Sequence, residues 1–323
     1  MKPEFPSYSR RRFLRYLLGA GALTVGGLDS VFAQNAPVIG AESFRFAFVT
    51  DLHLMQDGEM RSAEGIAACL AAVEKLNPRP EFILVGGDLV NKARELTIDE
   101  AGKRLDLFLK IWNDHTSLPA HWTFGNHDLV GTSNPAVLPE SSPLYGKGLF
   151  KERLKLSQLF YSFDFKGWHF VVLDDIDPLP DRTYEGKLFD NELAFLQADL
   201  DANKSKPTIV CTHIPILSNL PMGLLAAHTA TGQHVNPAKN LVCTNGNKLV
   251  ENIPSHPIRA VLAGHLHFFE RIEMNGVQFI NSGAVCGSYW KGPLYGCPEG
   301  FGIVDLGKDG SVAFDYHPYG WKA

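Results

Sequence analysis

Clusters of potential metal ligands follow separate apolar runs of the chain. They read Asp51-Leu52-His53, Gly87-Asp88, Gly125-Asn126-His127-Asp128, the single His213 and Gly264-His265-Leu266-His267. Imidazole and carboxylate groups of this kind bind transition metal ions such as Zn, Mn and Fe. The candidate ligands suffice for two ions if one carboxylate is shared, and they are Asp51, His53, Asp88, Asn126, His213, His265 and His267.

The positions of the glycines and cysteines indicate what kind of metal site the motifs form. A glycine directly precedes the first ligand in three of the motifs, where it lets the backbone pass close to bound ions. The five cysteines contain no C-x-x-C pair, which argues against a metal-thiolate site. In an oxidising compartment Cys286 and Cys297 either form a disulfide or stay as buried thiols, and both alternatives are open.

The apolar runs before these motifs are predicted to be β-strands of an α/β fold. They alternate with stretches of helical periodicity, the pattern of an α/β sandwich. Open α/β sheets bind ligands at the carboxyl ends of their strands, so the motifs are expected to meet there. Strands are expected at residues 44–49, 82–85, 120–124, 208–210 and 260–262, and helices at residues 66–76, 105–112 and 193–200.

Turn and loop signals organise the rest of the chain. Two stretches rich in Pro, Gly, Asn and Ser, residues 130–148 and 217–257, predict long loops of the kind that often form lids. His228 and His234 lie in the second stretch and are candidates for lining a substrate cleft. Hairpin turns are expected at Lys166-Gly167, Asn275-Gly276 and Lys308-Asp309-Gly310.

The amino terminus predicts an export signal. Basic residues from Arg10 to Arg15 precede an apolar, glycine-rich stretch, and small residues for cleavage end at Ala33. The paired arginines are similar to a twin-arginine signal, which is read by the Tat export machinery. Residues 1–33 are therefore expected to be removed, leaving residues 34–323 in the periplasm or secreted. The alternative is a basic membrane anchor that is never cleaved.

Composition excludes several classes of protein. The 323 residues are 45% hydrophobic and 20% charged, as in an ordinary globular protein. The formal net charge of -5 disfavours duplex nucleic acid as a partner. No stable membrane span is expected once the signal is removed.

The ordered motifs resemble those of the calcineurin-like metallophosphoesterases, whose pattern reads D-x-H, G-D, G-N-H-D, a single H and G-H-x-H. The resemblance runs from Asp51 to His267. It implies a four-layer α/β/β/α sandwich with two mixed β-sheets and the metals at one edge. It also implies that one ion is bound by Asp51, His53 and His267, the other by Asn126, His213 and His265, and both by Asp88.

Within that family the motif with His53 looks more like class III cyclic nucleotide phosphodiesterases than like purple acid phosphatases. The latter lack this histidine and carry a tyrosine three positions beyond the aspartate, where this chain has Asn91. His213 stands in Thr-His-Ile-Pro, whereas the cyclic nucleotide group commonly has a second histidine directly after the first. That departure leaves the substrate open.

These features predict an exported phosphodiesterase that acts on a small-molecule phosphoester with two divalent or mixed-valence ions of Mn, Fe or Zn. Such an ion pair clamps phosphoryl oxygens and lowers the pKa of a bridging water. His127 is expected to protonate the leaving alkoxide or to bind its developing charge, and Asp128 to orient His127. The alternatives are a phosphomonoesterase, a nucleotide or sugar pyrophosphatase, and a non-catalytic metal-dependent binding protein.

A group of aromatic residues follows the last candidate ligand. Tyr289, Trp290 and Lys291 lie in the segment 286–293. They either stack on a base or sugar of the substrate or pack beneath a loop.

Overall fold

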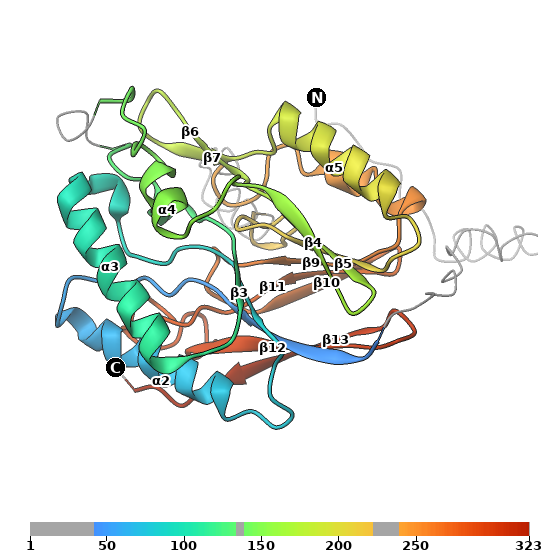
Figure 1. The fold of residues 1–323 in the computed structure, drawn as a ribbon, viewed down its shortest axis with the longest axis horizontal. Coiled ribbons are helices and arrows are strands. Elements are labelled where there is room, and N and C mark those ends of the chain that lie inside the picture. The colour runs from blue at the N-terminus through green and yellow to red at the C-terminus, as the bar shows by residue number, and fades with distance from the viewer. Residues whose placement is uncertain (1–41, 134–138, 222–238, 323) are drawn as a thin grey trace, which may run out of the picture. The chain divides into compact units, whose positions relative to one another are not determined.

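Two β-sheets pack face to face and carry helices on their outer faces (Figure 1). The structure is a computed structural model that describes residues 42–133, 139–221 and 239–322. The order of layers is helices, five-stranded sheet, six-stranded sheet, helices. This arrangement confirms the predicted four-layer α/β/β/α sandwich.

Both large sheets are mixed. The first has the order β13-β12-β1-β2-β3, which are Val312–Pro318, Gly300–Leu306, Phe44–Val49, Ile83–Val85 and Ala120–Trp122. The second has the order β10-β11-β9-β8-β5-β4, which are Glu270–Met274, Val277–Asn281, Ile258–Ala263, Thr208–Cys211, Trp168–Val172 and Tyr161–Phe165. A small sheet pairs β6 (Ile176–Pro178) with β7 (Tyr184–Gly186).

The direction of the strands places the ligand motifs. In the first sheet β1, β2 and β3 run parallel, and in the second β5, β8, β9 and β11 run parallel. The strands β4, β10, β12 and β13 are antiparallel to their neighbours. All five motifs follow parallel strands, namely β1, β2, β3, β8 and β9, so they lie at carboxyl ends of strands as predicted.

Alternating side chains on the strands build the core. On β1, Phe46 and Phe48 point between the sheets, whereas Ala47 and Val49 point toward the helices. The helices α2 (Ser62–Glu74), α3 (Ile98–His115) and α4 (Gly148–Arg153) supply apolar side chains to the core on the outer face of the first sheet. The helices α5 (Asp190–Ala202) and α7 (Asn247–Val250) do so for the second.

Local sequence signals account for the ends of several elements. Helix α3 begins with a capping box, in which Thr97 Oγ1 accepts from the amide of Glu100 and Glu100 Oε2 accepts from the amide of Thr97. The turns at Lys166-Gly167 and Asn275-Gly276 have positive φ at both residues and connect hairpins, as predicted. Short 3-10 turns lie at Glu59–Arg61, Ala93–Glu95, Asn126–Asp128 and Ile253–Ser255.

Some elements differ from the prediction. Strand β3 ends at Trp122 instead of residue 124, because the chain there turns into the Asn126 loop. The strands β6 and β7 were not predicted, since their three-residue pairing is too short to produce a period. Within the described ranges, no helix combines the length and the apolar character needed to cross a bilayer.

Candidate metal centre

Three of the predicted ligands converge at the end of β1 on one side of the centre. His53 Nε2 and His267 Nε2 lie 3.1 Å apart. Asp51 Oδ1 is 3.3 Å from His267 Nε2 and 3.8 Å from His53 Nε2. Three donor atoms that face one point at such distances form a group suited to a single cation.

A second group lies beside the first and shares Asp88 with it. Asn126 Oδ1 is 3.2 Å from His213 Nε2. Asp88 Oδ2 is 3.4 Å from His213 Nε2 and 3.3 Å from His53 Nε2, so one carboxylate oxygen faces both groups. His265 completes the second group with Asp88 and His213. The structure thus places all seven predicted ligands close to one another, and their division between two ions stays a prediction.

Backbone carbonyls fix the orientation of two imidazoles. His267 Nδ1 donates to the carbonyl of Gly287, and His213 Nδ1 donates to that of Gly86, both at 2.7 Å. In the neutral ring this bond leaves the lone pair on Nε2, which is the atom that faces the centre. His265 is held the other way round, because its Nε2 bonds the carbonyl of Asn240 at 2.7 Å and leaves Nδ1 free.

The backbone of the ligand loops is unusual. Five of the seven ligands are non-glycine residues at positive φ, a conformation that costs about 1–3 kcal/mol each. They are Asp51 at 54°, His53 at 43°, Asp88 at 54°, His265 at 69° and His267 at 59°. Neighbouring glycines permit the crowding that results: a Cβ on Gly125 would lie 2.0 Å from Asp88 Oδ1. The local strain is concentrated where the donor atoms are.

The charge and bonding of the two carboxylates fit a cationic ligand. Burial favours their neutral forms, yet the surrounding imidazoles hold the pKa of Asp51 and of Asp88 well below its usual range. Asp51 Oδ1 is fully buried and accepts no hydrogen bond from any residue that the structure describes. A buried ionised oxygen without a donor is costly unless a cation neutralises it. Together with the imidazole nitrogens, these carboxylates form a donor set for transition metal ions.

His127 lies against the first group and forms a further cluster of potential ligand atoms with His53 and Asp88, within 4.8 Å of one another. Its ring centroid is 4.5 Å from that of His53, edge to face. Its Nδ1 accepts from the amide of Lys92 at 3.0 Å, which leaves Nε2 as the protonated nitrogen. Burial lowers the pKa of His127 to about 3, so the ring is a neutral hydrogen-bond donor.

Asp128 has a different role from the one predicted. Its Oδ1 accepts from the amides of Leu89 and Val90 at 2.9 and 3.4 Å, and its Oδ2 accepts from the amide of Gly125 at 2.9 Å. The expectation that Asp128 orients the His127 ring is therefore corrected: the Lys92 amide holds that ring. Asp128 instead ties the Asp88 loop to the Asn126 loop, because backbone donors surround its carboxylate.

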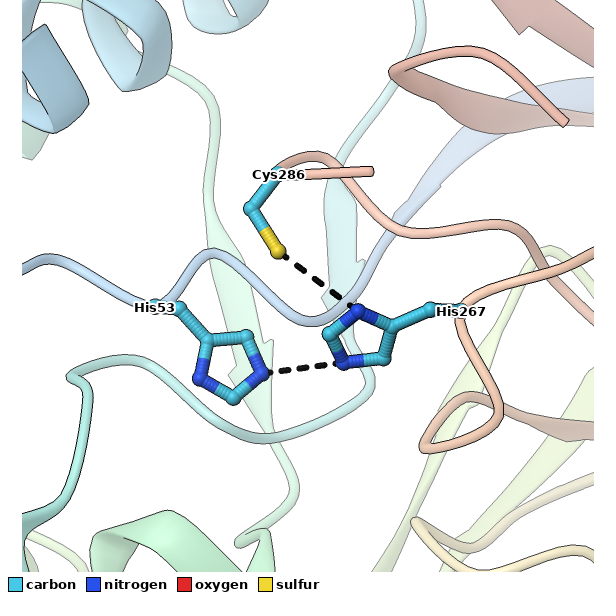
Figure 2. A group of neighbouring side chains, drawn as sticks. All are labelled: His53, His267 and Cys286. Atoms are coloured by element: carbon cyan, nitrogen blue, oxygen red, sulfur yellow. Dashed lines mark hydrogen bonds between the residues drawn. The ribbon is translucent and has the colours of Figure 1, made fainter. Parts of the chain in front are cut away.

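Cys286 lies beside the rings of His53 and His267, and one potential ligand atom from each of the three residues lies within 4.8 Å of the other two (Figure 2). Its Sγ is 3.7 Å from His267 Nδ1, whereas the nitrogen facing His53 is His267 Nε2. The thiol therefore lies beside Nδ1, the ring nitrogen that also bonds the Gly287 carbonyl. All five cysteines are free thiols, so Cys286 and Cys297 form no disulfide here.

Two tyrosines border the centre on different sides. The Tyr289 ring lies 4.7 Å from that of His53 and 4.8 Å from that of His267. The Tyr184 ring lies 6.2 Å from that of His265, and the Arg94 guanidinium stacks on it at 5.0 Å. Sequence patterns singled out Tyr289 but missed Tyr184 and Arg94, since neither stands in a motif or next to a ligand in the chain.

Histidines outside the motifs have ordinary surroundings where the structure describes them. His169 bonds the carboxylates of Asp164 and Asp199, and His256 contacts Asp201 and the carbonyl of Asn252. These bonds give both residues structural roles. The two candidates for a substrate cleft, His228 and His234, lie outside the described residues.

Known proteins with related sequences and structures identify the family. A family model described as calcineurin-like phosphoesterase matches residues 44–269. The 3',5'-cyclic adenosine monophosphate phosphodiesterase CpdA of Haemophilus influenzae is 25% identical over 87% of this chain and 90% of its own length. A 3',5'-cyclic-nucleotide phosphodiesterase of a Nostoc strain is 24% identical over 74% of this chain and 77% of its own.

A solved structure supports the same assignment at the level of the fold. A dimetal phosphatase from Danio rerio superposes with a TM-score of 0.59 at 17% identity, covering 88% of this chain and 97% of that protein. The family model spans most of the chain and every ligand motif. The chain therefore belongs to the calcineurin-like phosphoesterase family and is a metallophosphoesterase.

Proposed function

We propose that the protein is a phosphodiesterase with two transition metal ions, of Mn, Fe or Zn, that acts on a small-molecule phosphodiester. The observation that carries this proposal is the single oxygen Asp88 Oδ2, which lies 3.3 and 3.4 Å from the facing nitrogens of His53 and His213. One ion would be held by Asp51, His53 and His267, the other by Asn126, His213 and His265. A bound ion pair supplies hydroxide at neutral pH and offsets charge on the phosphoryl oxygens.

The protein's own groups serve orientation and charge. His127 presents a protonated Nε2 beside the first group, and its Nδ1 is already occupied by the Lys92 amide. We assign it to donating a hydrogen bond to the oxygen of the leaving group as negative charge develops there. The sequence predicts that His127 either protonates the leaving alkoxide or binds its developing charge. The second role suits a neutral imidazole better than the first.

Two features favour a diester over a monoester. His53 is present and fully buried within the first group. Relatives that match 87% and 74% of this chain are named as cyclic nucleotide phosphodiesterases. A phosphomonoesterase or pyrophosphatase would use the same donors, so only rates on chosen substrates separate these functions.

The test combines metal analysis with substrate preference. The purified protein is expected to hold two ions and to hydrolyse bis(p-nitrophenyl) phosphate faster than p-nitrophenyl phosphate. Chelation should abolish hydrolysis, and Mn, Zn or Fe should restore it. Strong preference for the monoester would reject the diesterase assignment, and phosphate-ester binding without turnover would favour a binding protein.

A matched pair of variants tests the shared carboxylate. Asp88→Ala should lower kcat/KM by more than about 100-fold and leave fewer than two ions per chain, because both groups lose a donor. Asp99→Ala, which alters a surface carboxylate 75% exposed, should change neither. Hydrolysis that survives Asp88→Ala with both ions retained would remove Asp88 from the centre.

We further propose export through the twin-arginine route with removal of residues 1–33. The support is the run of basic residues Arg10 to Arg12 before an apolar stretch. Replacing Arg11 and Arg12 together by lysine should leave full-length protein in the cytoplasm, whereas Arg15→Lys should not. Amino-terminal sequencing of exported wild type should begin at Gln34. Full-length protein in the membrane fraction would support an uncleaved anchor instead.

A further inference from the structure

Tyr289 stands out among residues near the centre because its ring contacts the rings of two predicted ligands and stays partly open. The centroid of the Tyr289 ring lies 4.7 Å from that of His53 and 4.8 Å from that of His267. The His127 ring lies 6.0 Å from it. The residue is 37% exposed. An aromatic face therefore borders the donors and the proposed leaving-group contact at once.

The backbone holds Tyr289 there at an energetic cost. Tyr289 and Trp290 both have positive φ, 53° and 68°, and neither is a glycine. Two consecutive residues in this region cost roughly 1–3 kcal/mol each, so the surrounding structure must enforce the turn. The amide of Ser288 donates to the carbonyl of Gly292 at 2.8 Å and closes the loop.

Trp290 is the anchor that enforces this conformation. Its side chain is fully buried and packs directly over Gly65, where a Cβ would lie 2.1 Å from the indole. The indole Nε1 donates to the carbonyl of His53 at 3.0 Å. The amide of Trp290 donates to the carbonyl of Cys286 at 2.6 Å, in the loop that passes beside His267 (Figure 2). Trp290 thus ties the turn to the backbone of His53 and of Cys286, and Tyr289 is directed to the centre as a result.

Tyr289 also has free bonding capacity. No group among the described residues forms a hydrogen bond with its hydroxyl. The hydrogen bonds that close the loop join backbone atoms. The two aromatic residues predicted together therefore divide into different roles. Trp290 packs beneath the loop, and Tyr289 is presented to whatever occupies the centre.

We propose that Tyr289 is a specificity residue whose ring stacks on an aromatic or nucleobase-like group of the bound phosphoester. This inference rests on the proposed function, since it places the phosphoryl group between the two ligand groups. With the phosphorus there, the organic substituent nearest His127 passes the Tyr289 ring. Stacking of this kind selects ring-bearing esters over alkyl esters.

Two phosphonates that differ only in their organic group test the stacking. Phenylphosphonate and methylphosphonate carry stable P–C bonds, and calorimetry with the two-metal protein measures their binding without turnover. Wild type should bind phenylphosphonate about five- to tenfold more tightly, the size of one aromatic contact. Tyr289→Ala should abolish that ratio, and Tyr289→Phe should keep it, because the ring and not the hydroxyl makes the contact.

The controls separate stacking from support of the centre. Methylphosphonate affinity and metal content should be the same in all variants. Tyr295→Ala, which alters a tyrosine 79% exposed just after this segment, should keep the wild-type ratio. A wild type without preference for the phenyl compound, or an unchanged ratio in Tyr289→Ala, overturns the inference. So does a parallel loss of methylphosphonate binding. Failure of the wild type to hold two ions, or to hydrolyse bis(p-nitrophenyl) phosphate, would instead reject the proposed function.

Discussion

Gly125→Ala is the sharpest test of how closely the loops around the centre are packed. Gly125 has φ -108° and ψ 176°, values that alanine adopts without strain. The added methyl group would nevertheless lie 2.0 Å from Asp88 Oδ1 and 2.5 Å from the Asp88 amide nitrogen. Any effect of this substitution is therefore due to steric displacement of Asp88 and not to backbone conformation.

The geometry sets the size of the effect. Ordinary contact begins at 3.4 Å, so the Asp88 carboxylate must move by roughly 1.4 Å. Metal ligation tolerates deviations of about 0.2 Å. The movement also breaks the 2.7 Å bond from the His127 amide to Asp88 Oδ1. A misplacement of about 1 Å commonly costs about 100-fold in rate, and at least that loss of kcat/KM is expected.

The assay is hydrolysis of bis(p-nitrophenyl) phosphate together with metal content by mass spectrometry, which should show fewer than two ions per chain. Gly102→Ala is the matched control. That glycine lies in α3, and the nearest atom to its added methyl is Arg153 Nη2 at 3.8 Å. The control should keep both ions and gain up to about 1 kcal/mol of stability. A folded Gly125→Ala with two ions and wild-type rates would refute the packing argument.

Three further predictions concern the remaining groups. His127→Ala should retain two ions per chain yet lose about 100-fold or more in kcat, and equal turnover would exclude it from the reaction. Asp128→Asn should lower the free energy of unfolding by about 1–3 kcal/mol in urea denaturation, because a side-chain amide cannot accept hydrogen bonds from all the backbone donors. An unchanged urea midpoint would contradict the role of Asp128 in tying the Asp88 loop to the Asn126 loop. The hydrogen bond from Arg79 lowers the pKa of Glu74 from 4.5 to about 2. A carboxyl whose pKa is lowered by folding stabilises the fold only while it is ionised, so the melting temperature of the wild type should exceed that of Glu74→Gln at pH 7. This difference in melting temperature should shrink as the pH falls from about 4.5 toward 2, and a difference that does not depend on pH would contradict the role of the Arg79 bond.

Local sequence patterns were sufficient for the elements that place the ligands. The apolar runs predict both the strand before Asp51 and the strand before His265, and each strand runs parallel to a neighbour in its own sheet, so both motifs lie at carboxyl ends of strands. Turn chemistry was equally local: Asn275-Gly276 connects β10 to β11 as predicted. These features depend on residues a few positions apart, which a single sequence displays.

Local sequence patterns do not predict contacts between segments that are far apart in the chain. The bond from Trp290 to the His53 carbonyl joins positions 237 residues apart, and the role of Asp128 depends on amides 38 and 39 residues away. Nothing near Tyr184 in the sequence marks it as a neighbour of His265. The sequence therefore identified which residues approach the centre through strand ends, and not those that reach it through loop packing.

The distribution of the ligand groups between the two sheets has a mechanical consequence. Asp51 and His53 extend from the five-stranded sheet, while His265 and His267 extend from the six-stranded one. In the proposed centre each ion would therefore act as a non-covalent cross-link across the sandwich. Separation of the sheets would require release of both ions, so the melting temperature of the whole domain should rise with free metal concentration.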